Sequence, residues 1–198
     1  ELVWSYYNLP ELCNEDGKIA NFNFYYAPLG VDAKVFKETK SRRQFIVANT
    51  GSGSRFSKEC KNEVISAANL LGKKIFQLGS GENSGTTFYS NGMKDKKLAK
   101  YLSQCEFVSG LRRVEGFELP VIEGLLCGAR PICFDRPHYR SWFNGLAEYI
   151  PEDENIVGSV GKIFMKGARP VTDKEKKYVE SHFNWETISK GFWKRLKI

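Results

Sequence analysis

Short apolar runs alternate with segments of helical spacing from about residue 43 onward, and this alternation limits the fold more than any other feature. Residues 43–49 and 74–78 are apolar runs of strand length, and each ends in a loop rich in glycine and serine. Between them, residues 58–71 repeat apolar side chains at the spacing of one helical face. Strands that alternate with helices predict βαβ units, and strands that are apolar throughout predict a parallel sheet covered on both faces.

The rest of the chain follows the same alternation. Strands are expected over residues 21–26, 106–108 and 131–134. Helices are expected over residues 95–103, 119–127 and 156–164, and two closing helices over residues 172–183 and 185–196. Residues 86–92 have the composition of a polar loop. We therefore predict an α/β fold in which helices flank a parallel sheet, with Trp185 holding the last helix in place.

Composition and charge exclude several classes of protein. Of the 198 residues, 41% are hydrophobic and 27% are charged, which is typical of a globular domain. No run of about 18 or more apolar residues is present, so we expect no membrane-spanning helix. The five cysteines form no C-x-x-C pair and only two histidines occur, so we expect reduced thiols and no metal site. A net charge of +7 favours anionic partners, namely nucleic acid, anionic lipid or phosphorylated small molecules.

Three loops rich in glycine or acidic residues follow predicted strands, over residues 50–58, 79–83 and 109–119. The carboxyl ends of parallel strands meet at one edge of a sheet, and open α/β sheets bind their ligands at that edge. Any one such loop is expected to do no more than turn the chain. Their convergence predicts a ligand site there.

The third loop carries two carboxylates, Glu115 and Glu123, separated by seven residues. Pro120 suits the first turn of a helix, which places Glu123 about one turn inside it and Glu115 in the loop before it. The N–H groups at the helix start favour a phosphate or a sugar hydroxyl, and a carboxylate can accept two hydrogen bonds from a ribose diol. Gly116 would let a ligand approach the backbone closely. The alternative is that both acids are ordinary surface residues favoured by the helix dipole.

The sequence E-G-F-x-L-P-x-x-E-x-x-x-x-G over residues 115–128, followed by a Pro-Ile strand, resembles the E-x(7)-E signature of the retaining GT-B glycosyltransferases. Gly30-Val31-Asp32 with Phe36 is similar to the linker between the two domains of that family. The resemblance covers roughly residues 28–198. It implies a Rossmann-like sheet, the C-terminal half of a GT-B fold, and a donor site for a nucleotide-diphosphate sugar.

The resemblance also implies roles for individual residues. Glu123 would bind the donor ribose, and Glu115 would act as the catalytic carboxylate near the donor sugar. The backbone around the helix start would hold the sugar and the diphosphate, through Gly116, Phe117, Glu118 and Leu119. Arg55, with either Lys58 or Lys61, would neutralise the leaving diphosphate in place of a metal ion.

Two departures from the family pattern affect these roles. Family members usually carry glycine where Glu118 stands, so an extra acid is expected beside the diphosphate, with Arg112 or Arg113 as possible compensation. The family has two Rossmann-like domains, whereas this chain offers one over residues 30–198. Residues 1–29 are then expected to be the tail of an acceptor-side domain or a linker. Activity would require the second domain.

The function implied is a retaining hexosyltransferase that takes a UDP- or GDP-sugar, needs no cofactor or metal, and acts on a glycan, lipid or protein acceptor. A cytoplasmic location is expected, with peripheral membrane contact as a further expectation from the positive charge. The alternative is a non-catalytic nucleotide- or partner-binding module on the same fold. A nucleic-acid-binding domain ranks last because the chain has no helix-turn-helix, zinc or RNP pattern, so no nucleic-acid partner is expected.

Overall fold

A computed structural model of the chain describes residues 2–6, 23–50, 60–79, 87–90, 92–113 and 117–196. Its main body is a six-stranded sheet in the order β5-β4-β3-β6-β7-β8, and every neighbouring pair in it is parallel. The strands are β3 (Phe45–Asn49), β4 (Ile75–Leu78), β5 (Thr87–Ser90), β6 (Cys105–Gly110), β7 (Arg130–Phe134) and β8 (Glu148–Ile150). This arrangement confirms the predicted parallel sheet.

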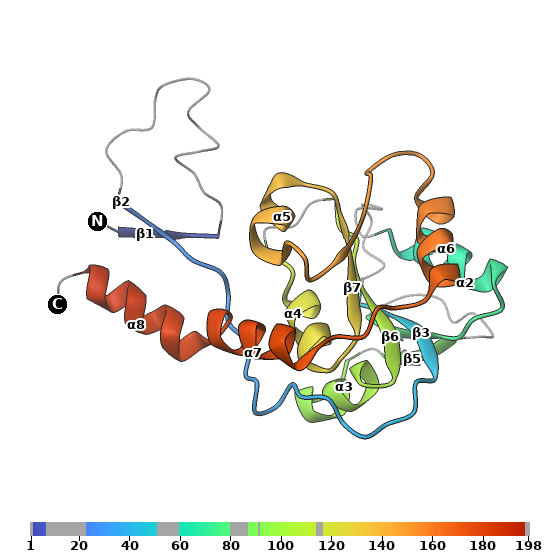
Figure 1. Ribbon diagram of the computed structural model, residues 1–198, viewed down its shortest axis with the longest axis horizontal. Coiled ribbons are helices and arrows are strands. Elements are labelled where there is room, and N and C mark those ends of the chain that lie inside the picture. Colours follow the sequence, from blue (N-terminus) through green and yellow to red (C-terminus); the bar gives the residue numbers. More distant parts are fainter. Residues whose placement is uncertain are drawn as a thin grey trace.

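Helices cover both faces of this sheet, as Figure 1 shows. On one face α2 packs against α6, and on the other α4 packs against α3 and α7. The helices are α2 (Lys61–Leu70), α3 (Asp95–Leu102), α4 (Leu119–Leu126), α5 (Pro137–Phe143), α6 (Ile156–Lys166), α7 (Asp173–His182) and α8 (Trp185–Arg195). The chain therefore has the doubly wound, Rossmann-like arrangement expected from its sequence.

The core lies between the sheet and these helices. All five residues of β3 are buried, and so are all five of β7, as expected for strands covered on both faces. Helix α4 lies very close to β6, since a Cβ at Gly124 would come within 2.3 Å of Val108 Cγ1. Glycine at this position is what allows the helix to approach the strand.

Three elements of the sheet domain were not expected from the sequence. Residues 86–92 were expected to be a polar loop, but Thr87–Ser90 form β5, the edge strand that pairs with β4. An edge strand has one neighbour only, so it lacks the continuous apolar run of a central strand. Helix α5 and strand β8 were also missed, because each is short and falls among turn residues.

The first two strands form a sheet of their own. Strands β1 (Leu2–Ser5) and β2 (Asn23–Tyr26) pair in parallel, and in Figure 1 they lie beside α8, apart from the main sheet. Trp4 contacts Trp185 and Phe192, with ring centroids 5.9 and 5.6 Å apart. The Tyr25 hydroxyl donates to the Ile188 carbonyl at 2.8 Å. The aromatic residues near the N-terminus therefore pack on α8, and Trp185 has the packing role expected from the sequence.

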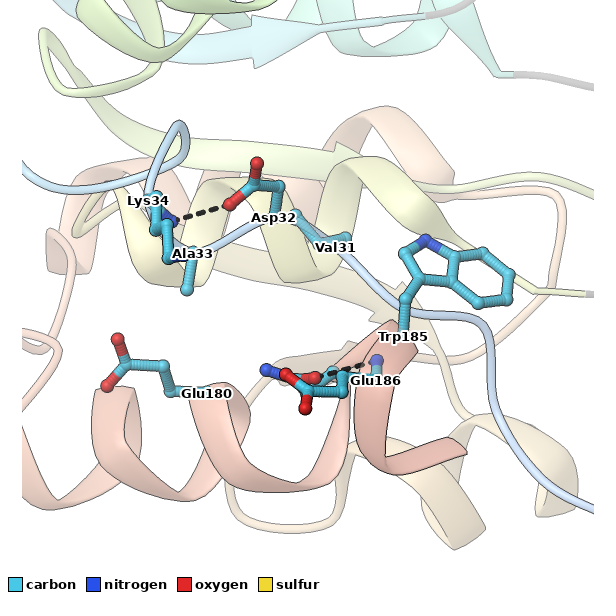
Figure 2. A pocket seen from close by; sticks show the side chains of 8 residues that line it. Val31, Asp32, Ala33, Lys34, Glu180, Trp185 and Glu186 are labelled. Atoms are coloured by element: carbon cyan, nitrogen blue, oxygen red, sulfur yellow. Dashed lines mark hydrogen bonds between the residues drawn. The ribbon is translucent and has the colours of Figure 1, made fainter. Parts of the chain in front are cut away.

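The segment after β2 crosses the junction between α7 and α8 closely. The Val31 amide donates to the Phe183 carbonyl at 2.8 Å. A Cβ at Gly30 would come within 2.6 Å of the Trp185 amide nitrogen, so only glycine fits there. A hollow of about 420 Å³ lies beside this crossing, with Asp32 on one side and α7 and α8 on the other (Figure 2). The Asp32 carboxylate accepts a hydrogen bond from the Lys34 amide at 2.8 Å, so it stabilises the turn that follows Gly30-Val31-Asp32.

A buried ion pair joins β7 to α7. The side chain of Arg130 is fully buried, and all five of its N–H donors are used. Two of them bond the Glu175 carboxylate at 2.9 and 3.1 Å, and the others bond backbone carbonyls. Burial alone would raise the pKa of Glu175, but hydrogen bonds from Arg130 and Thr172 outweigh it and lower the pKa to about 2. The first turn of α7 is thereby fixed to the sheet.

Four cysteines lie within the described residues, and all four are buried free thiols: Cys60, Cys105, Cys127 and Cys133. None of the helices in the described ranges is long and apolar enough to cross a lipid bilayer.

Candidate functional site

The sheet has one topological switch point, between β3 and β6. These two strands are neighbours, but the chain runs from β3 outward through β4 and β5 and from β6 outward through β7 and β8. The connections that follow β3 and β6 therefore leave in opposite directions, and in open α/β sheets this is the place where a crevice forms at the carboxyl edge. Ligands of open α/β sheets bind in such a crevice, so the candidate site is built on the residues that end these two strands.

The first turn of α2 is tied to the end of β3. Asn49, the last residue of β3, is almost completely buried, and its side-chain amide donates to the Lys61 carbonyl at 3.2 Å. Cys60, just before the helix, has the left-handed φ of 41°, which is rare for a residue with a side chain. Lys61 is thus the first residue of a helix whose start is fixed at the switch point.

On the other side of the switch point, α4 begins at Leu119 with Pro120 in its first turn, as the sequence predicts. Glu118 is the N-cap residue, but its side chain makes no capping hydrogen bond. The end of β6 packs tightly under this helix, because a Cβ at Gly110 would come within 2.6 Å of Val121 Cγ2. The start of α4 and the end of β6 are thereby held together at the switch point.

The Glu118 carboxylate turns into the protein instead of capping its helix. It is fully buried, accepts a hydrogen bond from the Tyr139 hydroxyl at 3.2 Å, and lies 3.6 Å from Arg112 Nε. Arg112 Nη2 also donates to the Thr50 carbonyl at 3.1 Å, just beyond β3. Burial raises the pKa of the Tyr139 phenol far above its usual range, and the charge of Glu118 adds to the effect. The extra acid noted in the sequence is therefore paired within the protein.

Glu123 lies one turn inside α4 and is half-buried. Burial raises the pKa of its carboxyl to about 7, and the negative charge of Asp95 at the start of α3 adds to the shift. At neutral pH the group is therefore close to its midpoint, and small changes around it decide whether it is charged. A carboxyl whose pKa is strongly raised is a common feature of functional sites.

The structure brings together part of the set expected from the sequence. Lys61, Phe117, Glu118, Leu119 and Glu123 all lie on α2, on α4 or just before α4. Phe117 is buried and packs against Phe143 and Phe183, so its side chain belongs to the core. The other expected residues lie outside the described ranges: Arg55, Lys58, Glu115 and Gly116. Their roles, and the choice between Lys58 and Lys61, stay predictions.

Sequence reasoning missed Asn49, Tyr139 and Asp95. The one signal for Asn49 in the sequence is its place as a polar residue at the end of an apolar run. Tyr139 and Asp95 reach the site from helices distant in sequence, and no local pattern marks them. Among the described residues, no three His, Cys, Asp or Glu side chains are close enough together to hold a metal ion.

Comparison with known proteins finds solved structures with a similar fold. No protein-family model matches the sequence, and no curated protein sequence matches it significantly. Among solved structures, sucrose-phosphate synthase from Thermosynechococcus elongatus superimposes with a TM-score of 0.78 at 17% identity, over 99% of this chain and 57% of that one. The chain has the α/β Rossmann-like fold found in GT-B structures.

Two further structures show the same likeness. The pneumococcal O-GlcNAc transferase GtfA, in complex with UDP and GlcNAc, matches 98% of this chain and 44% of its own, with a TM-score of 0.72 at 15% identity. Anabaena Alr3699/HepE, in complex with UDP-glucose, matches 99% of this chain and 63% of its own, with a TM-score of 0.72 at 12% identity. The chain thus spans less than two thirds of the length of each of the three.

Proposed function

We propose that the chain is the donor-binding domain of a glycosyltransferase and holds a nucleotide-diphosphate sugar in the crevice between β3 and β6. The observation that carries the proposal is Glu123, a half-buried carboxylate one turn inside α4, beside the topological switch point. A carboxylate at this place can accept two hydrogen bonds from the ribose hydroxyls of a nucleotide. Two structures of similar fold hold UDP, one together with GlcNAc and one as UDP-glucose.

The finer parts of the proposal concern the reaction. The sugar is transferred with retention, and Glu115 is the carboxylate nearest the donor sugar. The backbone from Gly116 to Leu119 holds the sugar and the diphosphate at the start of α4, whose N–H groups favour an anion. Arg55 and one of the two lysines, Lys58 or Lys61, neutralise the leaving group. Support for Lys61 comes from its place at the first residue of α2, beside the end of β3.

We further propose that activity requires a second domain, on the acceptor side of the crevice. Support comes from the shorter span of this chain relative to the similar structures, and from β1 and β2, which pair outside the main sheet. The acceptor is a glycan, a lipid or a protein. A cytoplasmic location and peripheral membrane contact stay predictions from the sequence.

Calorimetric titration of the full chain with UDP, GDP and ADP tests the proposal. We expect one nucleotide to bind, and the Glu123→Ala variant to lose about tenfold or more in affinity, as expected when two hydrogen bonds to a charged group are removed. The matched control is Glu106→Ala, which removes a carboxylate from within β6. Binding of none of the three nucleotides by a folded chain would contradict the proposal and favour a non-catalytic module on the same fold.

A further inference from the structure

The ion pair between Arg112 and Glu118 is buried at the switch point, and stability alone does not explain it. The Glu118 side chain is fully buried and that of Arg112 is 17% exposed. Removing two charges from water costs about as much as their attraction returns, so a buried ion pair is a weak source of stability. Glu118 stands at the N-cap position of α4, yet its carboxylate makes no capping hydrogen bond and contacts Tyr139 and Arg112 instead. The arrangement therefore calls for a second role.

The contacts of Arg112 fix its guanidinium from two sides of the switch point. Nε faces the Glu118 carboxylate at the start of α4, and Nη2 donates to the Thr50 carbonyl at the end of β3. The backbone of Arg112 is held as well, because its amide donates to the Gly110 carbonyl at 3.1 Å in a tight turn after β6. Tyr139 fixes the other carboxylate oxygen of Glu118. The side chain is thus pre-organised where the connections after β3 and β6 separate.

We propose that Glu118 is a positioning residue that holds the Arg112 guanidinium at the switch point as a binding group for the diphosphate of the donor. This inference rests on the proposed function and names a further residue of the same site. A guanidinium is always charged and its planar fork matches phosphate oxygens. A cation that is already fixed loses little freedom when the anion binds, so more of the attraction appears as affinity. The negative charge of Glu118 stays buried behind the guanidinium.

The test compares UDP, uridine and inorganic pyrophosphate as calorimetric titrants of the full chain. The main variant is the double substitution R112M/E118M, which removes both charges and leaves neither one buried alone. We expect it to keep its circular dichroism spectrum and to lose about 10- to 100-fold in affinity for UDP and pyrophosphate, the range for a charge-assisted contact. Uridine binding is expected to stay within about twofold, because uridine carries no phosphate.

Two single variants separate the positioning role of Glu118 from a general effect of positive charge near the site. Glu118→Gln keeps the Arg112 cation but weakens its anchor, so we expect a smaller loss of UDP affinity than in the double variant and no loss for uridine. Arg113→Gln is the matched control, because Arg113 is 35% exposed and lies 3.8 Å from both Glu63 and Glu152. Its UDP affinity is expected to stay within about threefold of wild type.

Each outcome bears on the inference. UDP affinity unchanged in R112M/E118M overturns the role of Arg112 and leaves the proposed function standing. An equal loss for UDP and uridine, or an equal loss in Arg113→Gln, also overturns it, because damage to the fold or loss of general charge then explains the result. Pyrophosphate binding that depends on Arg112, without binding of any nucleotide, supports the anion site and overturns the proposed function. No binding of any titrant overturns both.

Discussion

Substituting Glu123 by glutamine should change the pH dependence of donor binding and of stability together. The pKa of Glu123 is raised from its ordinary value of 4.5 to about 7, first by burial and then by the charge of Asp95. If only the carboxylate form accepts both ribose hydrogen bonds, affinity follows the ionised fraction, which rises from about one tenth at pH 6 to about nine tenths at pH 8. We therefore expect the affinity for UDP-glucose to rise about tenfold over this range.

The same shift predicts an opposite trend in stability. Below pH 4.5 Glu123 is protonated in both the folded and the unfolded chain. Between pH 4.5 and 7 the unfolded chain releases this proton and the folded chain retains it, so the free energy of unfolding falls as the pH rises. The difference between a pKa of 4.5 in the unfolded chain and about 7 in the folded chain corresponds to roughly 3 kcal/mol, which is an upper value for a half-buried group. Glu123→Gln should match the wild type at pH 4 and be more stable by up to that amount at pH 8.

Both effects are measurable on one pair of proteins. Calorimetry with UDP-glucose at pH 6, 7 and 8 gives the affinities, and urea unfolding at pH 4, 6 and 8 gives the free energies of unfolding. Glu154→Gln, which changes an exposed carboxylate, is the control and should follow the wild type throughout. The reasoning is refuted if Glu123→Gln keeps the wild-type slope in affinity, or if the stability difference between the two proteins does not grow from pH 4 to pH 8.

Two further predictions concern the scaffold. Glu175→Gln should lower the free energy of unfolding by about 3 kcal/mol at pH 7, because it leaves the Arg130 cation buried without a counter-charge. Urea unfolding should show the difference in stability between this variant and the wild type shrinking as the pH falls from 4.5 towards 2. Gly124→Ala should destabilise the chain by about 1–3 kcal/mol because the added Cβ meets Val108. Gly161→Ala should stabilise the chain by about 0.5–1 kcal/mol, because a Cβ at this position of α6 meets open space and alanine favours a helix more than glycine does. Thermal melts of the two glycine variants that shift in the same direction would contradict the packing argument.

The parts of the fold that the sequence predicts are those with a strong local pattern. Strands β3 and β7 are fully buried, so their runs are apolar along their whole length. Strand β5 lies at the sheet edge and its Phe88 is 39% exposed, so its mixture of polar and aromatic residues resembles a loop. Helix α5 has only seven residues, too few for a helical period to stand out.

In the candidate site, too, the sequence predicts only the features that have a local pattern. The position of Glu123 on its helix follows from local sequence, because Pro120 marks the helix start. The direction of the Glu118 side chain does not follow, since it depends on Tyr139, which is 21 residues away on another helix. The pKa of Glu123 likewise depends on Asp95, which α3 brings near in space. Spacing along the chain identifies the carboxylates, and tertiary packing decides which of them faces the protein interior.

The central claim is that the crevice between β3 and β6 binds a nucleotide-diphosphate sugar. Backbone amide NMR spectra of the full chain, titrated with UDP-glucose, test it most directly because they report where the ligand binds. We predict that saturable shift changes concentrate at the ends of β3 and β6 and in the first turns of α2 and α4, with Arg112 and Glu123 among the most affected. Changes confined to the hollow beside Gly30 and Trp185, or no saturable change at all, would contradict the account.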